Sequence, residues 1–296
     1  MPDRVLALLT APSVAGGGGP GGGDPFRFVD PDAPVVTVSD LGVTRGDGVF
    51  ETAGVVSGRA QALDAHLARL ARSAALLEMP EPDQEAWRAT VLAVVERLAG
   101  LPEAFVKLVY TRGIEGTGAP TGWVVGQAMP DHSAARTTGI GVVVLDRGLA
   151  HDSAGAAPWL LQGAKTLSYA VNMAALREAK RRGADDALFV SSDGYLLEGP
   201  TSSLLLKRGD RLITPSPSLG ILPGTTQADA FRFARSQGLT TSYELLPREA
   251  LDSADALWFV SSVRQAAPVR AVDGVERPID AAFTAELNTH LLGRRD

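Results

Sequence analysis

The chain contains no cysteine among its 296 residues. This absence excludes structural disulfides and metal sites built on thiolates, and we expect no metal site. No apolar run is long enough to span a bilayer. The short apolar run 5–9 is followed by Pro12 and glycines, which is not the pattern of a secretion signal. The formal charge of -6 offers no basic face to a phosphate backbone. We therefore expect a cytoplasmic protein that acts on a small molecule, without a nucleic-acid or membrane partner.

The size and composition of the chain are those of an ordinary globular protein. Hydrophobic residues make up 45% and charged residues 21%, and 296 residues suffice for two domains. Residues 15–24 are nearly all glycine and proline, which is typical of a flexible loop. That run lacks the Gly-Lys-Ser/Thr ending of a phosphate loop, so we do not expect it to bind a nucleotide.

Hydrophobic spacing predicts mixed helices and strands in both halves of the chain. Leucines 63, 67, 70 and 77 lie on one face of a helix that ends before Pro80. Further helices are expected at 84–99, 167–182 and 225–238, and strands at 35–38, 105–110, 123–127, 140–145, 187–190, 195–198 and 256–261. Residues 147–158 show no hydrophobic periodicity. We expect them to link an N-terminal domain, 1–146, to a C-terminal domain, 159–296. The pattern indicates an α+β fold.

Lysine is scarce, which shortens the search for an amine nucleophile. The four lysines are Lys107, Lys165, Lys180 and Lys207. Lys180 and Lys207 lie in a basic helix end and a hairpin turn, where solvent keeps an amine protonated. Lys165 has Gly, Ala, Thr and Leu as neighbours, an environment that disfavours the ammonium and favours a Schiff base with a carbonyl cofactor. A solvated lysine before a helix is the alternative.

Two other segments carry functional groups. Glu198 ends a predicted hairpin, where its carboxylate either pairs with a cofactor ring nitrogen or is a surface glutamate. The stretch 223–227, Pro-Gly-Thr-Thr-Gln, places hydroxyls and backbone amides at the start of a helix. That arrangement binds phosphate or serves as a plain helix cap. Arg69 would complete an anion site only if its helix packs nearby, and is otherwise solvated.

Taken in order, these segments resemble the class IV aminotransferase family of pyridoxal-phosphate enzymes, which has fold type IV and two domains. The family includes branched-chain and D-amino-acid aminotransferases and aminodeoxychorismate lyases. The likeness covers about residues 35–274. Its most specific blocks are 45–51 (Arg-Gly-Asp-Gly-Val-Phe-Glu), 65–70, 165–172, 193–203 and 222–226.

The resemblance implies a role for each of several residues in binding pyridoxal 5'-phosphate. Lys165 would be the Schiff-base lysine, Glu198 would pair with the pyridine nitrogen, and Tyr169 would lie near the ring hydroxyl. The residues that would hold the phosphate are Arg69, Thr225, Thr226 and Ser262. The chain departs from the common pattern at Ser203, where many members have Asn, and at 261–262, where Ser-Ser replaces Gly-Thr. The resemblance also implies a homodimer.

The cofactor residues do not separate a lyase from a transaminase. D-amino-acid aminotransferases place an Arg-x-His pair after a Thr-Arg-Gly turn, but here residues 114–119 follow that turn without the pair. The run 107–113, together with Phe50, is more similar to the lyases, whose dianionic substrate suits Lys107 and Arg112. We expect an aminodeoxychorismate lyase that releases pyruvate and 4-aminobenzoate. The alternatives are an amino-acid aminotransferase and, more remotely, a pyridoxal-phosphate-binding protein without turnover.

Overall fold

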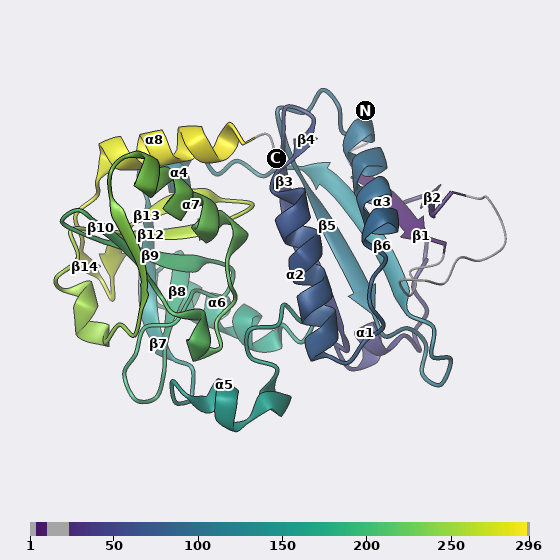
Figure 1. The fold of residues 1–296 in the computed structure, drawn as a ribbon, viewed down its shortest axis with the longest axis horizontal. Coiled ribbons are helices and arrows are strands. Elements are labelled where there is room, and N and C mark those ends of the chain that lie inside the picture. Colours follow the sequence, from purple (N-terminus) through teal and green to yellow (C-terminus); the bar gives the residue numbers. More distant parts are fainter. Residues whose placement is uncertain (1–3, 11–23, 295–296) are drawn as a thin grey trace. The chain divides into compact units, whose positions relative to one another are not determined.

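The structure, a computed structural model, describes residues 4–10 and 24–294 (Figure 1). Within that part, the chain forms two compact units. Unit 1 contains the described residues of 1–130, the segment 164–169 and Arg294, and unit 2 contains residues 131–163 and 170–293. Each unit combines a sheet with helices, which confirms the α+β class. The expected loop at 15–24 lies outside the described residues except for Asp24.

Unit 1 is built on an antiparallel sheet with the order β2-β1-β6-β5-β3-β4. Its strands are β1 (Arg4–Leu9), β2 (Phe26–Val29), β3 (Gly48–Val56), β4 (Arg59–Ala60), β5 (Glu103–Thr111) and β6 (Thr121–Ala128). The run 5–9, which the apolar pattern alone left unassigned, is the interior strand β1 because it pairs with β2 on one side and β6 on the other.

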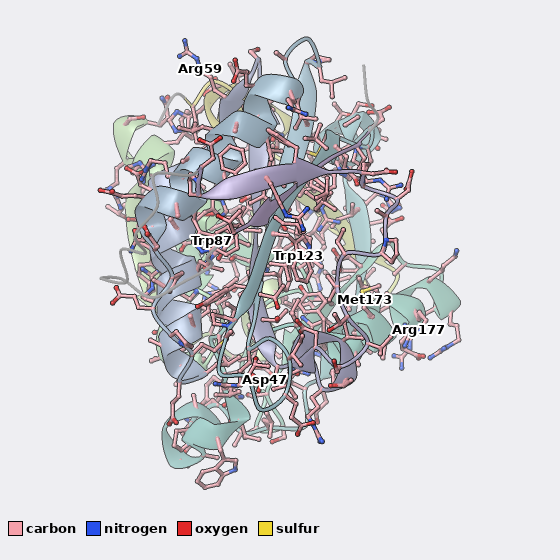
Figure 2. All side chains as sticks on the ribbon, turned by 90° about the vertical axis from the view of Figure 1, so that its right-hand side faces the viewer. Asp47, Arg59, Trp87, Trp123, Met173 and Arg177 are labelled. Atoms are coloured by element: carbon pink, nitrogen blue, oxygen red, sulfur yellow. The ribbon has the colours of Figure 1, made fainter. Side chains whose placement is uncertain are left out.

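Helices α2 (Leu63–Leu76) and α3 (Gln84–Arg97) cover one face of this sheet, and α1 (Leu41–Thr44) is a single turn (Figure 1). The predicted stripe is buried, with Leu67 and Leu70 both 1% exposed. Asp83 caps α3 by accepting hydrogen bonds from two amides of its first turn. Trp87 of α3, labelled in Figure 2, meets Tyr110 of β5 edge to face with ring centroids 5.9 Å apart.

Alternation along β3 decides which side chains reach the helices. Successive residues of a strand point to opposite faces, so Glu51 and Phe50 face different sides of the sheet. Glu51 contacts His66 and Arg69 on α2. Phe50 therefore lies on the face turned away from α2 and α3. The aligned residues of β5 on that face are Val109, opposite Phe50, and Lys107, opposite Thr52.

Unit 2 contains a mixed sheet with the order β11-β10-β9-β12-β13-β7-β8, and β14 pairs with β13. Its strands are β7 (Ile140–Asp146), β8 (Asp186–Val190), β9 (Ser203–Arg208), β10 (Arg211–Pro215), β11 (Thr240–Glu244), β12 (Ala256–Ser261), β13 (Gln265–Val272) and β14 (Val275–Glu276). The pairs β13-β7, β7-β8 and β10-β11 are parallel, and the others are antiparallel.

Helices pack on both sides of this second sheet. They are α4 (Ser133–Thr137), α5 (Ser153–Ala156), α6 (Ala170–Arg181), α7 (Thr225–Ser236) and α8 (Ala281–Leu292), with short 3₁₀ turns at Pro158–Leu160, Pro217–Leu219 and Arg248–Leu251. α7 and α8 share a core with β9 and β12 that includes Trp258, Phe231 and Phe283. α6 buries Ala175 and Ala179 against β7 and β8. No helix in the described ranges has both the length and the apolarity to cross a bilayer.

Three local predictions were wrong. Residues 195–198 form no strand, because Tyr195 and Leu196 make only isolated bridges to Pro247 and Val190. Residues 35–38 form no strand, because their backbone turns into α1 and Asp40 donates its amide to the carbonyl of Thr37 at 3.1 Å. The helix expected from Leu167 begins only at Ala170, because the backbone of Leu167 is hydrogen-bonded to β3. The expected division of the chain around residues 147–158 stays a prediction, and in the structure β7 belongs to the sheet of unit 2.

Candidate active site

The backbone of Lys165 is fixed along the first residues of β3. Phe50 donates its amide to the carbonyl of Lys165 at 3.0 Å, and Leu167 donates to the carbonyl of Gly48 at 2.8 Å. Lys165 donates its own amide to Ser73 Oγ on α2 at 3.1 Å. The segment 165–167 thus pairs with β3 on the edge opposite β5 and is also attached to α2. A backbone held in this way gives the Lys165 side chain a defined origin.

Three predicted residues, Lys165, Lys107 and Tyr169, gather around the ring of a fourth, Phe50. Lys165 Nζ lies 4.5 Å and Lys107 Nζ 4.9 Å from the ring centroid. The ring of Tyr169 meets Phe50 edge to face with centroids 5.3 Å apart. An aromatic face attracts a cation, so Phe50 helps to keep both amines in place. Burial lowers the pKa of Lys107, because the ammonium loses solvation there.

Arg69 is buried on α2 with a carboxylate beside it. Its Nε donates to Glu51 Oε1 at 2.7 Å, and its Nη2 donates to Glu51 Oε2 at 2.8 Å. His66 Nδ1 lies 2.7 Å from Glu51 Oε2. Since a carboxylate only accepts, that ring nitrogen carries the proton. Glu51 thereby fixes the guanidinium plane of Arg69 through two parallel hydrogen bonds.

The charges of this buried group are set by their mutual contacts. Burial by itself would raise the pKa of Glu51, but the charge and hydrogen bonds of Arg69, aided by His66, hold that pKa far below its usual range. Burial is also the main influence on His66 and lowers the pKa of its imidazole, against the opposing effect of Glu51. His66 is therefore neutral and Glu51 is ionised near neutral pH, which leaves one positive and one negative charge in contact.

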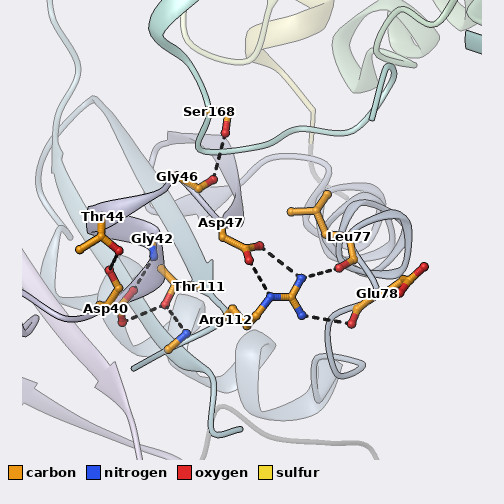
Figure 3. Close-up of polar contacts among 11 residues, drawn as sticks. Asp40, Gly42, Thr44, Gly46, Asp47, Leu77, Glu78, Thr111, Arg112 and Ser168 are labelled. Atoms are coloured by element: carbon orange, nitrogen blue, oxygen red, sulfur yellow. Dashed lines mark hydrogen bonds and ion pairs between the residues drawn. The ribbon is translucent and has the colours of Figure 1, made fainter. Parts of the chain in front are cut away.

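Arg112 is directed at acceptors of the protein itself (Figure 3). Its Nε donates to Asp47 Oδ2 at 2.7 Å, and its Nη2 donates to Asp47 Oδ1 at 3.3 Å. The same Nη2 donates to the carbonyl of Leu77 at 2.6 Å, and Nη1 donates to that of Glu78 at 3.3 Å. These bonds join the turn before β3 to the end of α2. The expected substrate contact of Arg112 stays a prediction.

Unit 2 holds the remaining predicted residues. Glu198 follows a turn at Gly194, and its backbone carbonyl accepts from the amide of Phe189 at 2.9 Å. Its side-chain Oε1 accepts from the amide of Leu222 at 3.1 Å. The carboxylate is thus tied to the segment that leads into α7. This contact orients Glu198 as an acceptor next to the loop that begins the helix.

Three hydroxyls converge at the start of α7. Ser262 Oγ lies 3.4 Å from Thr225 Oγ1 and 3.3 Å from Thr226 Oγ1. The N-cap residue is Gly224, which has no side chain to accept from the first amides of the helix. An anion at this end would be favoured by those amides and by the helix dipole, by about 0.3–1 kcal/mol per charge for the dipole alone.

Two arginines hold the loop that carries Ser262 in place through hydrogen bonds. Arg264 Nη2 donates to Asp186 Oδ2 at 2.6 Å and to Ser202 Oγ at 2.9 Å. Arg136 Nε donates to the carbonyl of Arg264 at 3.1 Å. Asp186 is 1% exposed, so this is a buried ion pair. The contacts fix the loop between β12 and β13 and with it the hydroxyl of Ser262.

The donor set present fits pyridoxal phosphate. An amine on a fixed backbone suits the aldehyde, a carboxylate suits the ring nitrogen, and an uncapped helix start with three hydroxyls suits the phosphate dianion. The residue assignments themselves stay predictions. Sequence reasoning assigned no role to Glu51, Ser73, Asp47 or Arg264. The leucine stripe gave no signal for Glu51, because by itself it leaves Arg69 solvated.

Comparison with known proteins agrees with this donor set. The sequence profile of the family described as Amino-transferase class IV matches residues 48–272. A bifunctional aminodeoxychorismate lyase / D-amino acid transaminase of Mycobacterium tuberculosis is 44% identical over 262 residues, which are 85% of this chain and 91% of that protein.

Two solved structures are similar over nearly the whole chain. CpuTA1, a fold IV-transaminase from Curtobacterium pusillum, matches with a TM-score of 0.94 and 53% identity over 99% of this chain and 100% of that one. A hypothetical aminotransferase from Mycobacterium tuberculosis in its PLP-bound form matches with a TM-score of 0.88 and 40% identity over 98% and 99% of the two chains. The chain therefore belongs to the class IV amino-transferase family and is a pyridoxal-phosphate-dependent enzyme.

Proposed function

We propose that this enzyme is an aminodeoxychorismate lyase, which releases pyruvate and 4-aminobenzoate. The observation that carries the proposal is the second amine beside Phe50. Lys107 Nζ and Lys165 Nζ lie 4.9 Å and 4.5 Å from the same ring centroid. A substrate with two carboxylates gains from a cation in addition to the groups that hold the cofactor, whereas an ordinary amino acid has one carboxylate to satisfy. The named lyase activity of the Mycobacterium tuberculosis relative supports this choice.

Lys165 has two tasks in this proposal. Its Nζ would bind the aldehyde of the cofactor, and as a free amine the same Nζ would remove the proton from the amine-bearing carbon of the substrate. Pyridoxal phosphate supplies an electron sink next to that carbon. The hydrogen bonds of Lys165 to Phe50 and Ser73 keep the backbone still while the side chain moves.

The other predicted residues would bind and orient the cofactor or the substrate. Glu198 would keep the ring nitrogen protonated, and Tyr169 would contact the ring hydroxyl. The converging hydroxyls of Thr225, Thr226 and Ser262 would hold the phosphate. Arg69, whose plane Glu51 fixes, would add a positive charge to it. Lys107 binds a substrate carboxylate, and Phe50 contacts the substrate beside it.

A transaminase is the second candidate, and a specific observation favours it. CpuTA1, at 53% identity, is a fold IV-transaminase, and the Mycobacterium tuberculosis relative carries both activities in its name. Both reactions begin with the same proton removal by Lys165. They separate afterwards, because the lyase expels pyruvate whereas the transaminase returns a proton and releases a keto acid.

The test supplies the purified, cofactor-loaded protein with aminodeoxychorismate and, separately, with D- or L-amino acids and a keto-acid acceptor. The proposal predicts 4-aminobenzoate and pyruvate in equal amounts, with no need for the acceptor. Amine transfer that requires the acceptor, without any 4-aminobenzoate, would contradict it and favour the second candidate.

A substitution of Lys107 should affect turnover of the dicarboxylate aminodeoxychorismate more than turnover of a monocarboxylate amino acid. Lys107→Gln removes one charged contact, which is worth about 1.5–3 kcal/mol, so kcat/KM for aminodeoxychorismate falls roughly 10- to 150-fold. Its effect on a monocarboxylate amino acid should be smaller. The matched control is Lys180→Gln on the exposed end of α6. Equal losses with both substrates would remove Lys107 from the recognition of a second carboxylate.

We also propose that the enzyme is a homodimer and that it is cytoplasmic. Sedimentation of the purified full-length chain at several concentrations tests the first point. A single species with the mass of one chain would contradict it.

A further inference from the structure

An ion pair between Asp47 and Arg112 holds the turn before β3, residues 45–48. Asp47 accepts from Nε and Nη2 of Arg112 (Figure 3). The backbone amide of Arg112 also donates to the carbonyl of Asp47 at 3.1 Å. Each of these two side chains is about a third exposed, at 34% for Arg112 and 30% for Asp47. Because Arg112 also donates to the last carbonyls of α2, the pair fixes the turn to the helix that carries Ser73 and Arg69.

The other side of the turn is anchored by α1. Asp47 donates its amide to the carbonyl of Leu41 at 3.1 Å. Asp40 caps α1 with one carboxylate oxygen and accepts from Thr111 Oγ1 with the other at 3.0 Å. Thr111 is the last residue of β5 and directly precedes Arg112. Asp47 is therefore held between the start of α1 and the end of β5, and its ion pair joins this frame to α2.

The same turn contacts the segment that carries Lys165. Ser168 Oγ donates to the carbonyl of Gly46 at 3.2 Å (Figure 3). Leu167 donates its amide to the carbonyl of Gly48 at 2.8 Å. A Cβ on Gly46 would lie 2.9 Å from Ser168 Oγ, and one on Gly48 would lie 2.8 Å from Leu167 Cδ1. The two glycines flank Asp47 and let the segment 165–168 lie directly against the turn. Any displacement of Asp47 therefore displaces the acceptors of that segment.

We propose that Asp47 and Arg112 are positioning residues that set the place of Lys165 through the turn 45–48. The inference rests on the proposed role of Lys165 as the amine that holds the cofactor and moves the proton. A misplacement of about 1 Å in a reacting group lowers a rate by roughly 100-fold, so the position of this amine is worth fixing. In this inference Arg112 acts on the reaction through Asp47 and the Lys165 segment.

The first test uses the full-length chain without cofactor. Hydrogen exchange is measured at the amides of Phe50 and Leu167, which bridge β3 and the Lys165 segment. Asp47→Asn and Arg112→Gln should each speed exchange at both amides by roughly tenfold or more, because the turn that holds them is released. The control is Asp64→Asn, which breaks the exposed ion pair of Asp64 with Arg88 in the same unit and should leave both amides unchanged.

The second test distinguishes positioning from a loss of fold. With cofactor bound, Asp47→Asn and Arg112→Gln should shift the pH midpoint of the visible absorbance of the lysine-bound cofactor and lower kcat more than they raise KM, whereas Asp64→Asn should change neither. Arg112→Lys, which keeps the charge near Asp47, should restore part of the wild-type pH midpoint.

Three results would overturn the inference. The first is unchanged hydrogen exchange at the amides of Phe50 and Leu167 in both Asp47→Asn and Arg112→Gln. The second is faster exchange in Arg112→Gln confined to the end of α2, with Asp47→Asn like the wild type, since Arg112 would then only cap that helix. The third is faster exchange with an unchanged pH midpoint and unchanged kcat. A protein that binds no cofactor would contradict the proposed function instead. The exchange measurements would still show whether the ion pair of Asp47 with Arg112 holds the turn 45–48.

Discussion

Replacement of Glu51 by Gln isolates the buried carboxylate that orients Arg69. The wild-type carboxylate is fully buried and accepts from Arg69 Nε and Nη2 and from His66 Nδ1. The glutamine keeps one oxygen acceptor and places an NH₂ donor against the donors of Arg69 and His66. Breaking a buried ion pair by removing one partner costs about 3–5 kcal/mol. At about 2–4 °C per kcal/mol for a protein of this size, the melting temperature should fall by roughly 6–20 °C.

The same variant has a distinct pH signature. The folded-state pKa of Glu51 lies well below that of the unfolded chain, which is about 4.3. Between these two values the unfolded state binds more protons, so stability rises with pH across that interval. The stabilisation that Glu51 provides is therefore complete at pH values above its unfolded-state pKa. It is lost as the pH falls toward its folded-state pKa. Glu51→Gln should lack this part of the acid destabilisation.

The assay is thermal unfolding of wild type, Glu51→Gln and the control Glu244→Gln over a range of acidic and neutral pH. Glu244 pairs with Arg211 at the surface, where an ion pair is worth about 0–1 kcal/mol, so its loss should change the melting temperature little. If Glu51→Gln melts together with the wild type near neutral pH and loses stability in acid as the wild type does, the buried pair does not have the assigned strength. Weaker binding of inorganic phosphate by Glu51→Gln would further link the pair to Arg69.

Two further substitutions test the residues of unit 2. Glu198→Gln keeps an oxygen that accepts from the amide of Leu222, so cofactor should still bind, but proton removal from the substrate should slow by roughly 100- to 1,000-fold, measured by single-turnover kinetics. An unchanged rate would refute the role of Glu198 at the ring nitrogen. Ser262→Ala removes one hydroxyl of the helix-start cluster and should weaken cofactor binding by roughly tenfold or more, measured by equilibrium dialysis. Wild-type affinity in Ser262→Ala would exclude that hydroxyl from phosphate binding.

Periodicity predicted the elements whose own side chains decide their structure. The leucine stripe of α2 is buried as expected, and the strands β5, β6 and β12 form where alternating or continuous apolar residues predict them. The run 35–38 has strand propensity but no neighbouring strand to complete its hydrogen bonds. Its backbone instead leads into α1. Conversely, β1 is a strand because β2 and β6 lie beside it, which its own short sequence could not indicate.

The sequence predicted a set of site residues, and their assignments stay predictions, but it gave little of their geometry. The motif around Lys165 points to this amine, whereas local pattern extended the following helix back to Leu167. The backbone there is occupied by hydrogen bonds to Gly48 and Phe50, which come from more than a hundred residues earlier in the chain. Arg112 was predicted as a substrate residue from its charge, and its guanidinium is directed at Asp47 and the end of α2. Only tertiary structure reveals such partners.

The proposed function requires a covalent bond between Lys165 and the cofactor. The direct measurement is reduction of the cofactor-loaded enzyme with borohydride, followed by digestion and mass spectrometry of the lysine-containing peptides. We expect a pyridoxyl group on Lys165 and an unlabelled, colourless protein for Lys165→Ala. A label on Lys107, or a visible absorbance band that persists in Lys165→Ala, would contradict it.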